Sequence, residues 1–235
     1  MKINILIFFI TLSILFSCEK QEVTQLPVNY DYGYFPLDSG IWREFNVTFI
    51  NIDKQTNVYD TINYQLREVF AGWYLNAAGD STMRIERFVR DSINHPWRET
   101  TVWYAYIKNR DAIQNEGNIK YLKIKFPSIL NSEWNGDIYN RFDTLNTYNY
   151  TISSVDIAEQ INNITFDSVL TVTQKYKESI IDKIYFYEKY AYGIGLIEKQ
   201  QIDIYSSDVD PSIPIEERVT KGTIYSQKII KYGKN

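Results

Sequence analysis

The sequence is poor in the residues on which catalytic and metal sites most often depend. Among its 235 residues there is one cysteine and one histidine. Triads of the Ser-His or Cys-His type would therefore all depend on His95. That residue lies in an Asn-His-Pro-Trp run, which is typical of a surface turn. Zinc sites built from histidine and cysteine are excluded by count. We expect no catalytic residue, no cofactor and no bound metal.

The chain also lacks concentrated positive charge and long apolar runs. Its 25 lysine and arginine residues are spread along the sequence, and the net charge is −4. A nucleic-acid-binding protein would show a basic face, so we expect no nucleic-acid partner. No stretch after residue 17 reaches the ~20 apolar residues that a membrane-spanning helix needs.

The N-terminus carries the most informative pattern. A basic Met1-Lys2 start is followed by an apolar run over residues 3–16 and then by Ser17-Cys18. This order is typical of an export signal. With cysteine directly after the expected cleavage point, it resembles the bacterial lipoprotein signal. The resemblance implies that residues 1–17 are removed, that the Cys18 thiol receives a diacylglycerol, and that the freed amine receives a further acyl chain.

Two other interpretations of this segment remain open. It could be an ordinary signal peptide with a cysteine near the cleavage point by chance, or it could be a transmembrane helix. The apolar run is shorter than the ~20 residues that spanning requires, which counts against the helix. Lipidation would hold the protein on a membrane without crossing it. Each buried acyl CH₂ contributes about 0.8 kcal/mol, so two or three chains detach slowly.

The rest of the chain divides into a tether and a domain. Residues 18–33 are polar, contain Pro27 and show no sustained periodicity, so we expect the lipidated Cys18 to be followed by a flexible linker. Residues 34–235 have the length of a single domain. Because Cys18 is the only cysteine, this domain contains no disulfide and depends on its hydrophobic core.

The domain has the composition and periodicity of a β-sheet protein. Twenty tyrosine, 12 phenylalanine and five tryptophan residues suit pleated, half-buried surfaces. Within 120–126, apolar and polar residues alternate, which predicts that Leu122 is buried and that Lys123 lies on the opposite, solvated face. Turn-forming residues separate such segments at spacings typical of antiparallel sheets. The other clear strand segments are 102–107, 147–154, 169–173 and 184–187.

We therefore expect an all-β fold with little helix. Long aromatic strands follow one another in sequence, which favours a strongly twisted antiparallel meander that forms a half-barrel or a sandwich. Only residues 155–162 and 176–183 would allow a turn or two of helix. The half-barrel and the sandwich both remain open at this point.

Three motifs carry a resemblance to a family. A Phe-Pro-Leu-Asp-Ser-Gly-Ile-Trp run covers residues 35–42, a Phe-Pro pair at 126–127 precedes Trp-Asn-Gly at 134–136, and a Tyr-Ala-Tyr-Gly-Ile-Gly-Leu-Ile run covers residues 190–197. Together they resemble a group of uncharacterised lipoproteins from Bacteroidota. The resemblance spans most of residues 34–200. It implies an exported all-β lipoprotein and brings no activity with it.

The glycines in these motifs predict backbone geometry. Gly40 would allow a tight turn that delivers Trp42 to the core. Gly193 and Gly195 lie two residues apart in a strand-like run. This spacing predicts a bulge, a sharp bend or a close approach by a neighbouring backbone.

A second pattern consists of Asp, then Ser or Thr, then an apolar residue or Thr, and it occurs five times. About one such triplet would be expected by chance. The triplet resembles the O-glycosylation acceptor of exported Bacteroidota proteins. The alternative is that Asp and Ser or Thr favour turns, after which an apolar residue begins the strand. The candidate acceptor hydroxyls are those of Thr61, Ser81, Ser92, Thr144 and Ser168.

Carboxylate chemistry is the one catalytic possibility that the composition leaves open. The chain has 29 acidic residues, and a glycosidase needs two of them across a cleft. Pairing of this kind cannot be read from sequence order. Asp203, Asp208 and Asp210 lie in one segment, but calcium loops space their ligands more tightly, so we interpret the segment as a solvated acidic loop.

These observations lead to three functional hypotheses. The first is a non-enzymatic envelope module, anchored to the outer membrane by its N-terminal lipid, that binds a partner protein or an apolar ligand on a curved, aromatic-lined sheet. The second is a structural or accessory subunit of an outer-membrane assembly, with an outer-membrane protein as its partner. The third is a carboxylate-dependent glycan hydrolase. Whether the protein faces the periplasm or the cell surface stays open, since residues 19–22 resemble the surface-export signal of Bacteroidota lipoproteins only weakly.

Overall fold

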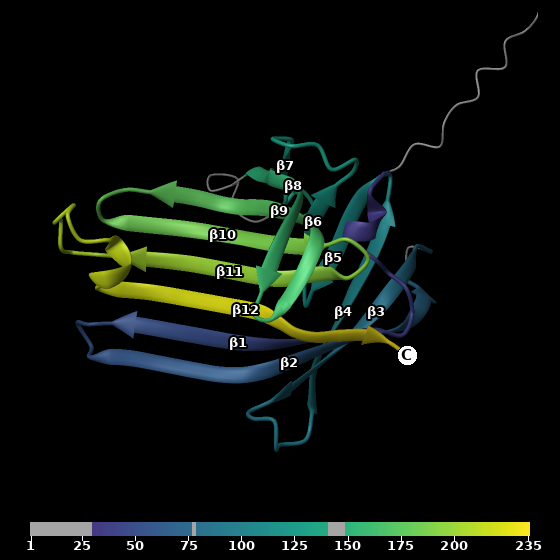
Figure 1. Ribbon diagram of the computed structural model, residues 1–235, viewed down its shortest axis with the longest axis horizontal. Helices are drawn as coiled ribbons and strands as arrows, with labels where there is room; N and C mark the ends of the chain where they lie inside the picture. Colours follow the sequence, from purple (N-terminus) through teal and green to yellow (C-terminus); the bar gives the residue numbers. More distant parts are fainter. Residues whose placement is uncertain (1–29, 77–78, 141–148) are drawn as a thin grey trace, which may run out of the picture.

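The computed structural model describes residues 30–76, 79–140 and 149–235, and most of these residues are in β-strands (Figure 1). Two short 3-10 helices accompany the strands, η2 (Tyr32–Tyr34) and η4 (Ile215–Glu217). In the described part of the chain, no helix is long and apolar enough to cross a membrane. The strands are β1 (Ile41–Asp53), β2 (Val58–Leu75), β3 (Ser81–Arg90), β4 (Arg98–Lys108), β5 (Asp111–Glu116), β6 (Ile119–Lys125), β7 (Glu133–Asn135), β8 (Asn149–Ile161), β9 (Ile164–Glu178), β10 (Asp182–Ala191), β11 (Gly195–Tyr205) and β12 (Lys221–Lys234).

Among the described residues, 12 strands form one antiparallel sheet in the order β6-β5-β4-β3-β2-β1-β12-β11-β10-β9-β8-β7. Each half of this order is a meander, in which strands that follow one another in sequence lie side by side. The pairing of β1 with β12 joins the halves, with Ile41 opposite Lys234 and Asp53 opposite Lys221. The predicted antiparallel meander is confirmed, and the first and last strands meet at its centre.

The two edges of the sheet approach each other. The backbone N–H of Leu122 in β6 donates to the carbonyl of Gly136, directly after β7, over 2.8 Å. The indole N–H of Trp134 in β7 donates to the Leu122 carbonyl over 2.9 Å. Of the two expected forms, the sheet therefore takes the half-barrel, curled until it is nearly closed.

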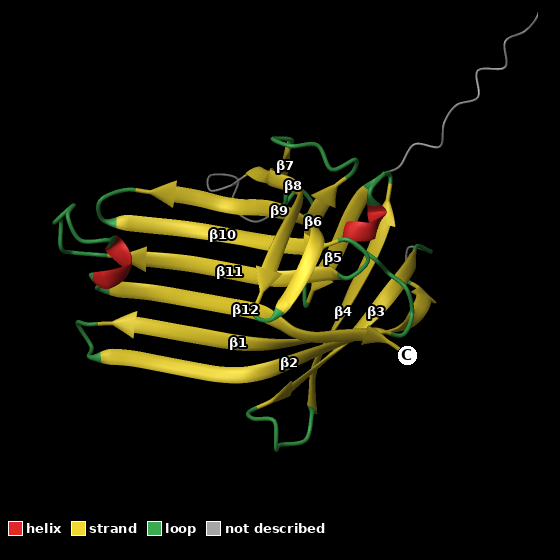
Figure 2. Ribbon diagram, in the orientation of Figure 1, coloured by secondary structure: helices red, strands yellow, loops and turns green. Residues whose placement is uncertain are grey.

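The barrel closes over only part of the long strands. Figure 2 shows that β9–β12, β1 and β2 extend to one side beyond the rest of the barrel. We call their outer ends the open part: residues 48–53, 58–63, 175–178, 182–187, 200–205 and 221–226. The remaining lengths of these strands, which β3–β6 face, form the covered part. Register shifts mark bulges in β2, β9 and β11, which increase the local twist and let the sheet curl.

Strand register sorts the inner face into rows of side chains that cross the sheet. In the covered part, one row holds Glu188, Lys199, Gln227, Val47 and Tyr64. The next row toward the open part is rich in aromatic residues, and we call it the aromatic row. It consists of Lys175, Phe186, Gln201, Tyr225, Phe49 and Ile62.

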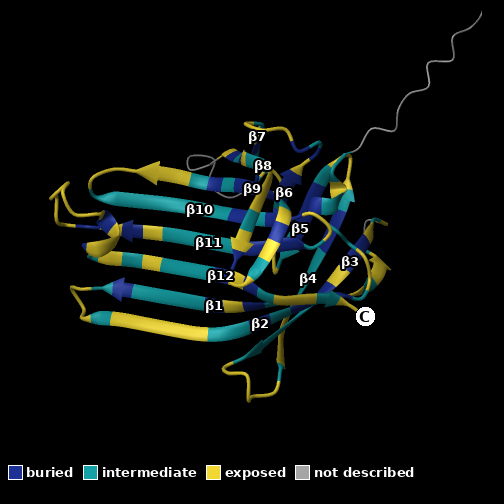
Figure 3. Ribbon diagram, viewed as in Figure 1, coloured by how far each residue is buried: buried dark blue, intermediate teal, exposed yellow. Residues whose placement is uncertain are grey.

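The largest apolar cluster fills the covered part, where Figure 3 shows most of the buried residues. It joins side chains from both halves of the sheet, such as Ile85 and Leu122 on one side and Leu170 and Tyr190 on the other. Phe35, from the segment before β1, packs into the same cluster. The segment before β1 thus contributes to the main core.

Two smaller clusters lie elsewhere. One contains Phe45, Ile197 and Ile229 together with Phe166 from the β8–β9 hairpin. The Asn162 side chain at the tip of this hairpin donates to the Ile229 carbonyl over 2.7 Å. The other cluster joins η4 to the outer ends of three strands through Ile52, Ile204, Ile215, Val219 and Ile224.

The expected helical turns are wrong. Residues 155–161 belong to β8, and residues 176–178 form the end of β9. Ile157 pairs with Val169 across the hairpin, so strand pairing overrides any local preference for helix.

The glycine predictions hold with one correction. Gly193 and Gly195 form the sharp turn between β10 and β11, with φ values of 76° and 85°. Gly40 has a φ of 85° and forms the expected tight turn. The residue that this turn delivers to the core is Ile41, not Trp42, which is half-buried beneath the cationic groups of Arg67 and Lys231.

Candidate functional site

A polar pocket of about 290 Å³ lies inside the curled sheet, where the covered part meets the open part. Strands β5, β6, β8, β9, β10 and β11 and the turn after β7 contribute to its wall. Its charged side chains are Glu116, Lys123, Asp137, Lys175 and Lys199, and its uncharged ones are Tyr121, Tyr150, Gln174, Phe186 and Gln201. This volume is near the lower end of the range for small-molecule sites, about 300–1,000 Å³.

A square of four charges forms one wall. Lys123 from β6 contacts Glu116 of the neighbouring strand and Glu188 across the barrel, each over 2.7 Å. Lys199 completes the square, at 3.4 Å from Glu116 and 3.3 Å from Glu188. Two positive and two negative charges therefore balance within the barrel, as buried ionised groups require.

The square holds its members in their charged forms. Burial alone would raise the pKa of Glu116, but the positive charges of Lys123 and Lys199 outweigh it and lower the pKa to about 2. At Glu188, too, the charges of Lys123 and Lys199 outweigh the effect of burial and lower the pKa below its usual value. Burial would lower the pKa of Lys123, yet the two carboxylates raise it well above the usual value.

Two tyrosines lie beside the charge square. Tyr190 donates its hydroxyl hydrogen to Glu188, and burial together with that carboxylate raises the pKa of Tyr190. Tyr150 is buried on the opposite side, where burial raises its pKa. Its ring packs on Gly136, since a Cβ at that glycine would lie 2.3 Å from the ring. Both phenols stay protonated at neutral pH and can donate hydrogen bonds.

Gln174 reaches the pocket through a β-bulge. Thr173 pairs with Tyr187 and Lys175 pairs with Phe186, so Gln174 is the extra residue of β9. Bulges re-aim side chains next to functional sites. The Gln174 side chain is 4% exposed, and its Nε2 has no hydrogen-bond partner among the described residues.

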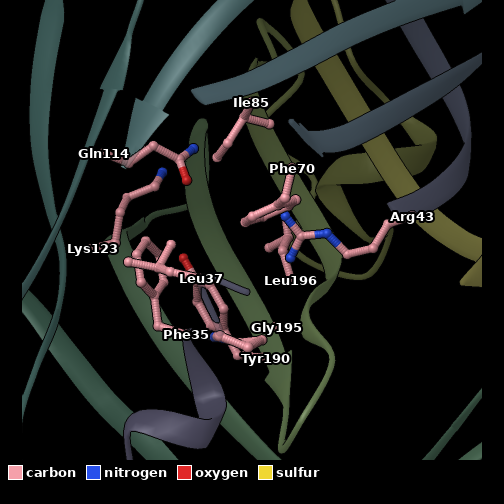
Figure 4. A pocket seen from close by; sticks show the side chains of 11 residues that line it. Phe35, Leu37, Arg43, Phe70, Ile85, Gln114, Lys123, Tyr190, Gly195 and Leu196 are labelled. Carbon is pink, nitrogen blue, oxygen red and sulfur yellow. The ribbon is translucent and has the colours of Figure 1, made fainter. Parts of the chain in front are cut away.

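A second cluster of charges lies deeper in the covered part. Arg43 donates to Glu68 over 2.9 Å, and Arg87 donates to the other oxygen of the same carboxylate over 3.2 Å. The Arg87 guanidinium lies over the ring of Trp103, 3.4 Å from its centroid. Figure 4 shows Arg43 facing Phe35 and Leu37 across a cavity of about 10 Å³. That volume is about the size needed for one water molecule, so this cavity is not a ligand site.

The described residues place four of the five predicted O-glycosylation hydroxyls. Thr61 in β2, Ser81 at the start of β3 and Ser92 in the following turn are exposed. Ser168 lies half-buried in β9, and its hydroxyl lies 2.7 Å from that of Tyr34. Thr144 and the predicted lipidation site, Cys18, lie outside the described residues. The four described hydroxyls are spread over the molecule and are not part of the pocket.

The remaining candidates from the sequence form no site. His95 is exposed in the turn after β3, where its Nδ1 lies 3.0 Å from the Ser92 hydroxyl. Asp208 and Asp210 accept hydrogen bonds from nearby backbone N–H groups in an exposed loop. Among the described residues, no group of three or more His, Cys, Asp or Glu side chains could hold a metal ion.

Sequence reasoning missed every residue of the charge square. It placed Lys123 on the solvated face of a strand, and this is wrong, because Lys123 is 3% exposed. In this region β6 is buried on both faces, with Leu122 and Ile124 also buried, so alternation does not predict exposure. One signal was present: Glu188 directly follows the aromatic strand segment 184–187.

Comparisons with known proteins give one structural similarity and no family. No protein-family model and no curated protein matches the sequence. Among solved structures, the fold is similar to a protein from Bacteroides fragilis that is described as exported and as having a YmcC-like fold. The TM-score is 0.42 and the sequence identity is 11%, with 85% of this chain and 98% of the other covered.

Proposed function

We propose that this protein is a non-enzymatic, lipid-anchored module of the cell envelope that binds a small polar ligand in the pocket of its curled sheet. The observation that carries the proposal is a pocket of about 290 Å³ with charged and hydrogen-bonding walls inside the curled sheet. Such convergent polar groups in a concave site are typical of small-molecule binding. The polar lining replaces the apolar ligand of our first hypothesis with a polar one.

The state of the carboxyl groups supports binding over catalysis. A glycosidase needs one carboxylic acid that keeps its proton near neutral pH, which requires a raised pKa. Glu116 has a pKa of about 2, and the pKa of Glu188 is also lowered. Both groups are committed to Lys123 and Lys199, so neither supplies a general acid for glycan hydrolysis.

The anchor rests on the N-terminal pattern that ends in Cys18. Metabolic labelling with palmitate should label the protein expressed from the complete sequence. The labelled protein should be recovered in the membrane fraction. Cys18→Ser should lose the label and move to the soluble fraction. A labelled or membrane-bound Cys18→Ser protein would contradict the anchor. Protease treatment of intact cells, with a periplasmic protein as control, would then assign the membrane face.

Ligand binding is tested by native mass spectrometry of the protein purified from the cell envelope of its native host. We expect a non-covalent small molecule on the wild type and on Gln200→Trp, whose indole would lie on the outer face. Gln201→Trp should lose it, because the indole would fill the pocket. Thermal unfolding of both variants separates blocked binding from misfolding. A wild-type protein that carries no small molecule, and acquires none from an envelope extract, would overturn the proposal.

An accessory role in an outer-membrane assembly is the second candidate. The outer face of the open part carries a tyrosine cluster, with ring centroids 5.7 Å apart for Tyr176 and Tyr185 and 5.0 Å apart for Tyr185 and Tyr187. Tyr176 is 61% exposed, and exposed aromatic groups are enriched at protein interfaces. If this candidate is right, Tyr176→Ala should release a co-purifying membrane protein and leave pocket binding unchanged.

A further inference from the structure

The geometry points to a neutral saccharide as the ligand of the pocket, with Gln174 donating a hydrogen bond to it and the aromatic row supporting its ring. This inference rests on the proposed function and adds the chemical class of the ligand. Three independent features of the pocket carry it: an unpaired buried amide, a balanced set of charges, and aromatic faces beside polar groups.

The first feature is the amide of Gln174. A buried N–H without a partner is costly, and proteins seldom keep one without a reason. The Gln174 side chain is 96% buried and lines the pocket, and its Nε2 meets no acceptor among the described residues. The bulge in β9 turns this side chain toward the pocket and leaves Gln174 without a paired residue on β10. A ligand hydroxyl or carbonyl oxygen would satisfy the amide.

The second feature is the charge balance. Lys123 and Lys199 are neutralised by Glu116 and Glu188 within the square. Outside the square, the lining adds one positive charge from Lys175 and one negative charge from Asp137. An anion or a cation would enter a site with no net opposite charge and would lose its hydration there. A neutral ligand with many hydroxyl groups loses less hydration free energy on entering the pocket. It can also hydrogen-bond to both the donors and the acceptors of the wall.

The third feature is the position of aromatic rings. Phe186 lines the pocket and belongs to the aromatic row, which continues across the inner face through Tyr225 and Phe49. Pyranose rings carry faces of C–H groups between hydroxyl-bearing edges, and the negative face of an aromatic ring attracts the partly positive hydrogens of those C–H groups. Gln201 lies between Phe186 and Tyr225 in the same row, within reach of hydroxyl groups. This alternation of ring and amide matches the two sides of a sugar.

The row also extends beyond the pocket. Ile62 at its far end is 55% exposed, so the inner face of the open part is accessible to solvent. A ligand longer than one sugar unit could therefore place one residue in the pocket and the next along the row. We expect disaccharides to bind more tightly than their component monosaccharides.

Binding is tested on the purified protein by saturation-transfer NMR and calorimetry. The probes are glucose, N-acetylglucosamine, maltose and cellobiose, with glycine and succinate as zwitterionic and anionic comparators. We expect at least one saccharide to bind and both comparators to fail. Gln174→Met should weaken saccharide binding about tenfold. Gln200→Met, on the outer face of β11, should leave binding unchanged.

Stability measurements distinguish a ligand-binding amide from a structural one. Because Nε2 of Gln174 is unpaired in the free protein, Gln174→Met should unfold at the same or a higher temperature than the wild type. A Gln174→Met protein that unfolds at a clearly lower temperature would show that the amide serves the fold, and the inference would fail. Unchanged saccharide affinity in a stable Gln174→Met protein would overturn it as well.

The panel also separates this inference from the proposed function. Binding of glycine or succinate without any saccharide would overturn the saccharide assignment and leave the ligand-binding function in place. Failure of every probe, together with a ligand-free protein in native mass spectrometry, would overturn both. A high-resolution crystal structure grown with the saccharide should show a hydroxyl or carbonyl oxygen within hydrogen-bond distance of Gln174, and a water alone at that position would contradict the inference.

Discussion

The covered and open parts of the barrel are made by the same strands, yet their side chains have different surroundings. On β10, Glu188 and Tyr190 are 1% and 2% exposed, whereas residues 184–187 of the same strand are half-buried. On β2, Leu66 is buried and Ile62 is exposed, although both lie on the inner face. Burial is therefore decided by what lies across the barrel from a strand, and the pocket forms where that cover ends.

The two parts also use charge differently. In the covered part, Glu188 is buried and pairs with two lysines, so solvent screens these ion pairs only weakly. In the open part, ion pairs such as Lys177 with Asp182, 3.5 Å apart, are exposed and screened.

The largest effect should follow removal of a buried carboxylate. Glu188→Ala leaves Lys123 and Lys199 with Glu116 alone, and we expect a loss of about 3–5 kcal/mol in the free energy of unfolding. Asp182→Ala, on the same strand in the open part, should cost less than about 1 kcal/mol. Urea denaturation measures both. Equal losses would remove the distinction between the two parts.

The next effect is on pH dependence. The pKa of Glu116 is about 2 in the folded protein and 4.5 ordinarily, so its carboxylate stabilises the fold above pH 4.5. That contribution, about 3 kcal/mol, should disappear as the pH falls from 4.5 toward 2. Unfolding free energies measured across this range should fall less steeply for Glu116→Gln than for the wild type. Parallel pH profiles would contradict the charge square.

A smaller effect should separate two glycines in one turn. Both Gly193 and Gly195 have positive φ values, so alanine at either position should cost about 1–2 kcal/mol. At Gly195 a Cβ would also lie 2.5 Å from Nη1 of Arg43, whereas at Gly193 it would meet no described atom within 4 Å. Thermal unfolding should therefore show a clearly larger loss for Gly195→Ala. Similar losses would mean that Arg43 moves aside freely.

The smallest effect is expected at the open end of the inner face. Ile62→Ser removes an exposed side chain and should change the free energy of unfolding by less than about 0.5 kcal/mol. Chemical denaturation at two protein concentrations measures this change. A loss above about 1 kcal/mol that grows with protein concentration would show that a second copy covers the open part in solution.

Local sequence patterns predicted strands well because the period of two is set by the backbone itself. The segments around Tyr106, Ile124, Ile152 and Leu170 are strands of the expected fold. The same reasoning failed at Lys123, because alternation assumes that one face of the strand is exposed to solvent, whereas both faces of β6 are buried there. It also could not pair Glu188 with Lys123, which lie 65 residues apart and meet only when β6 crosses to β10.

The sequence by itself determined the all-β class and the unusual backbone at Gly193 and Gly195, and it predicted a lipid anchor at Cys18. These depend on local properties: side-chain alternation, positive backbone angles, and a short N-terminal signal. Only the tertiary structure decided which charges are buried, where the pocket lies, and that Gln174 faces it. Those features arise from a bulge and from contacts across the barrel, and both depend on how far the sheet curls, which no short stretch of sequence encodes.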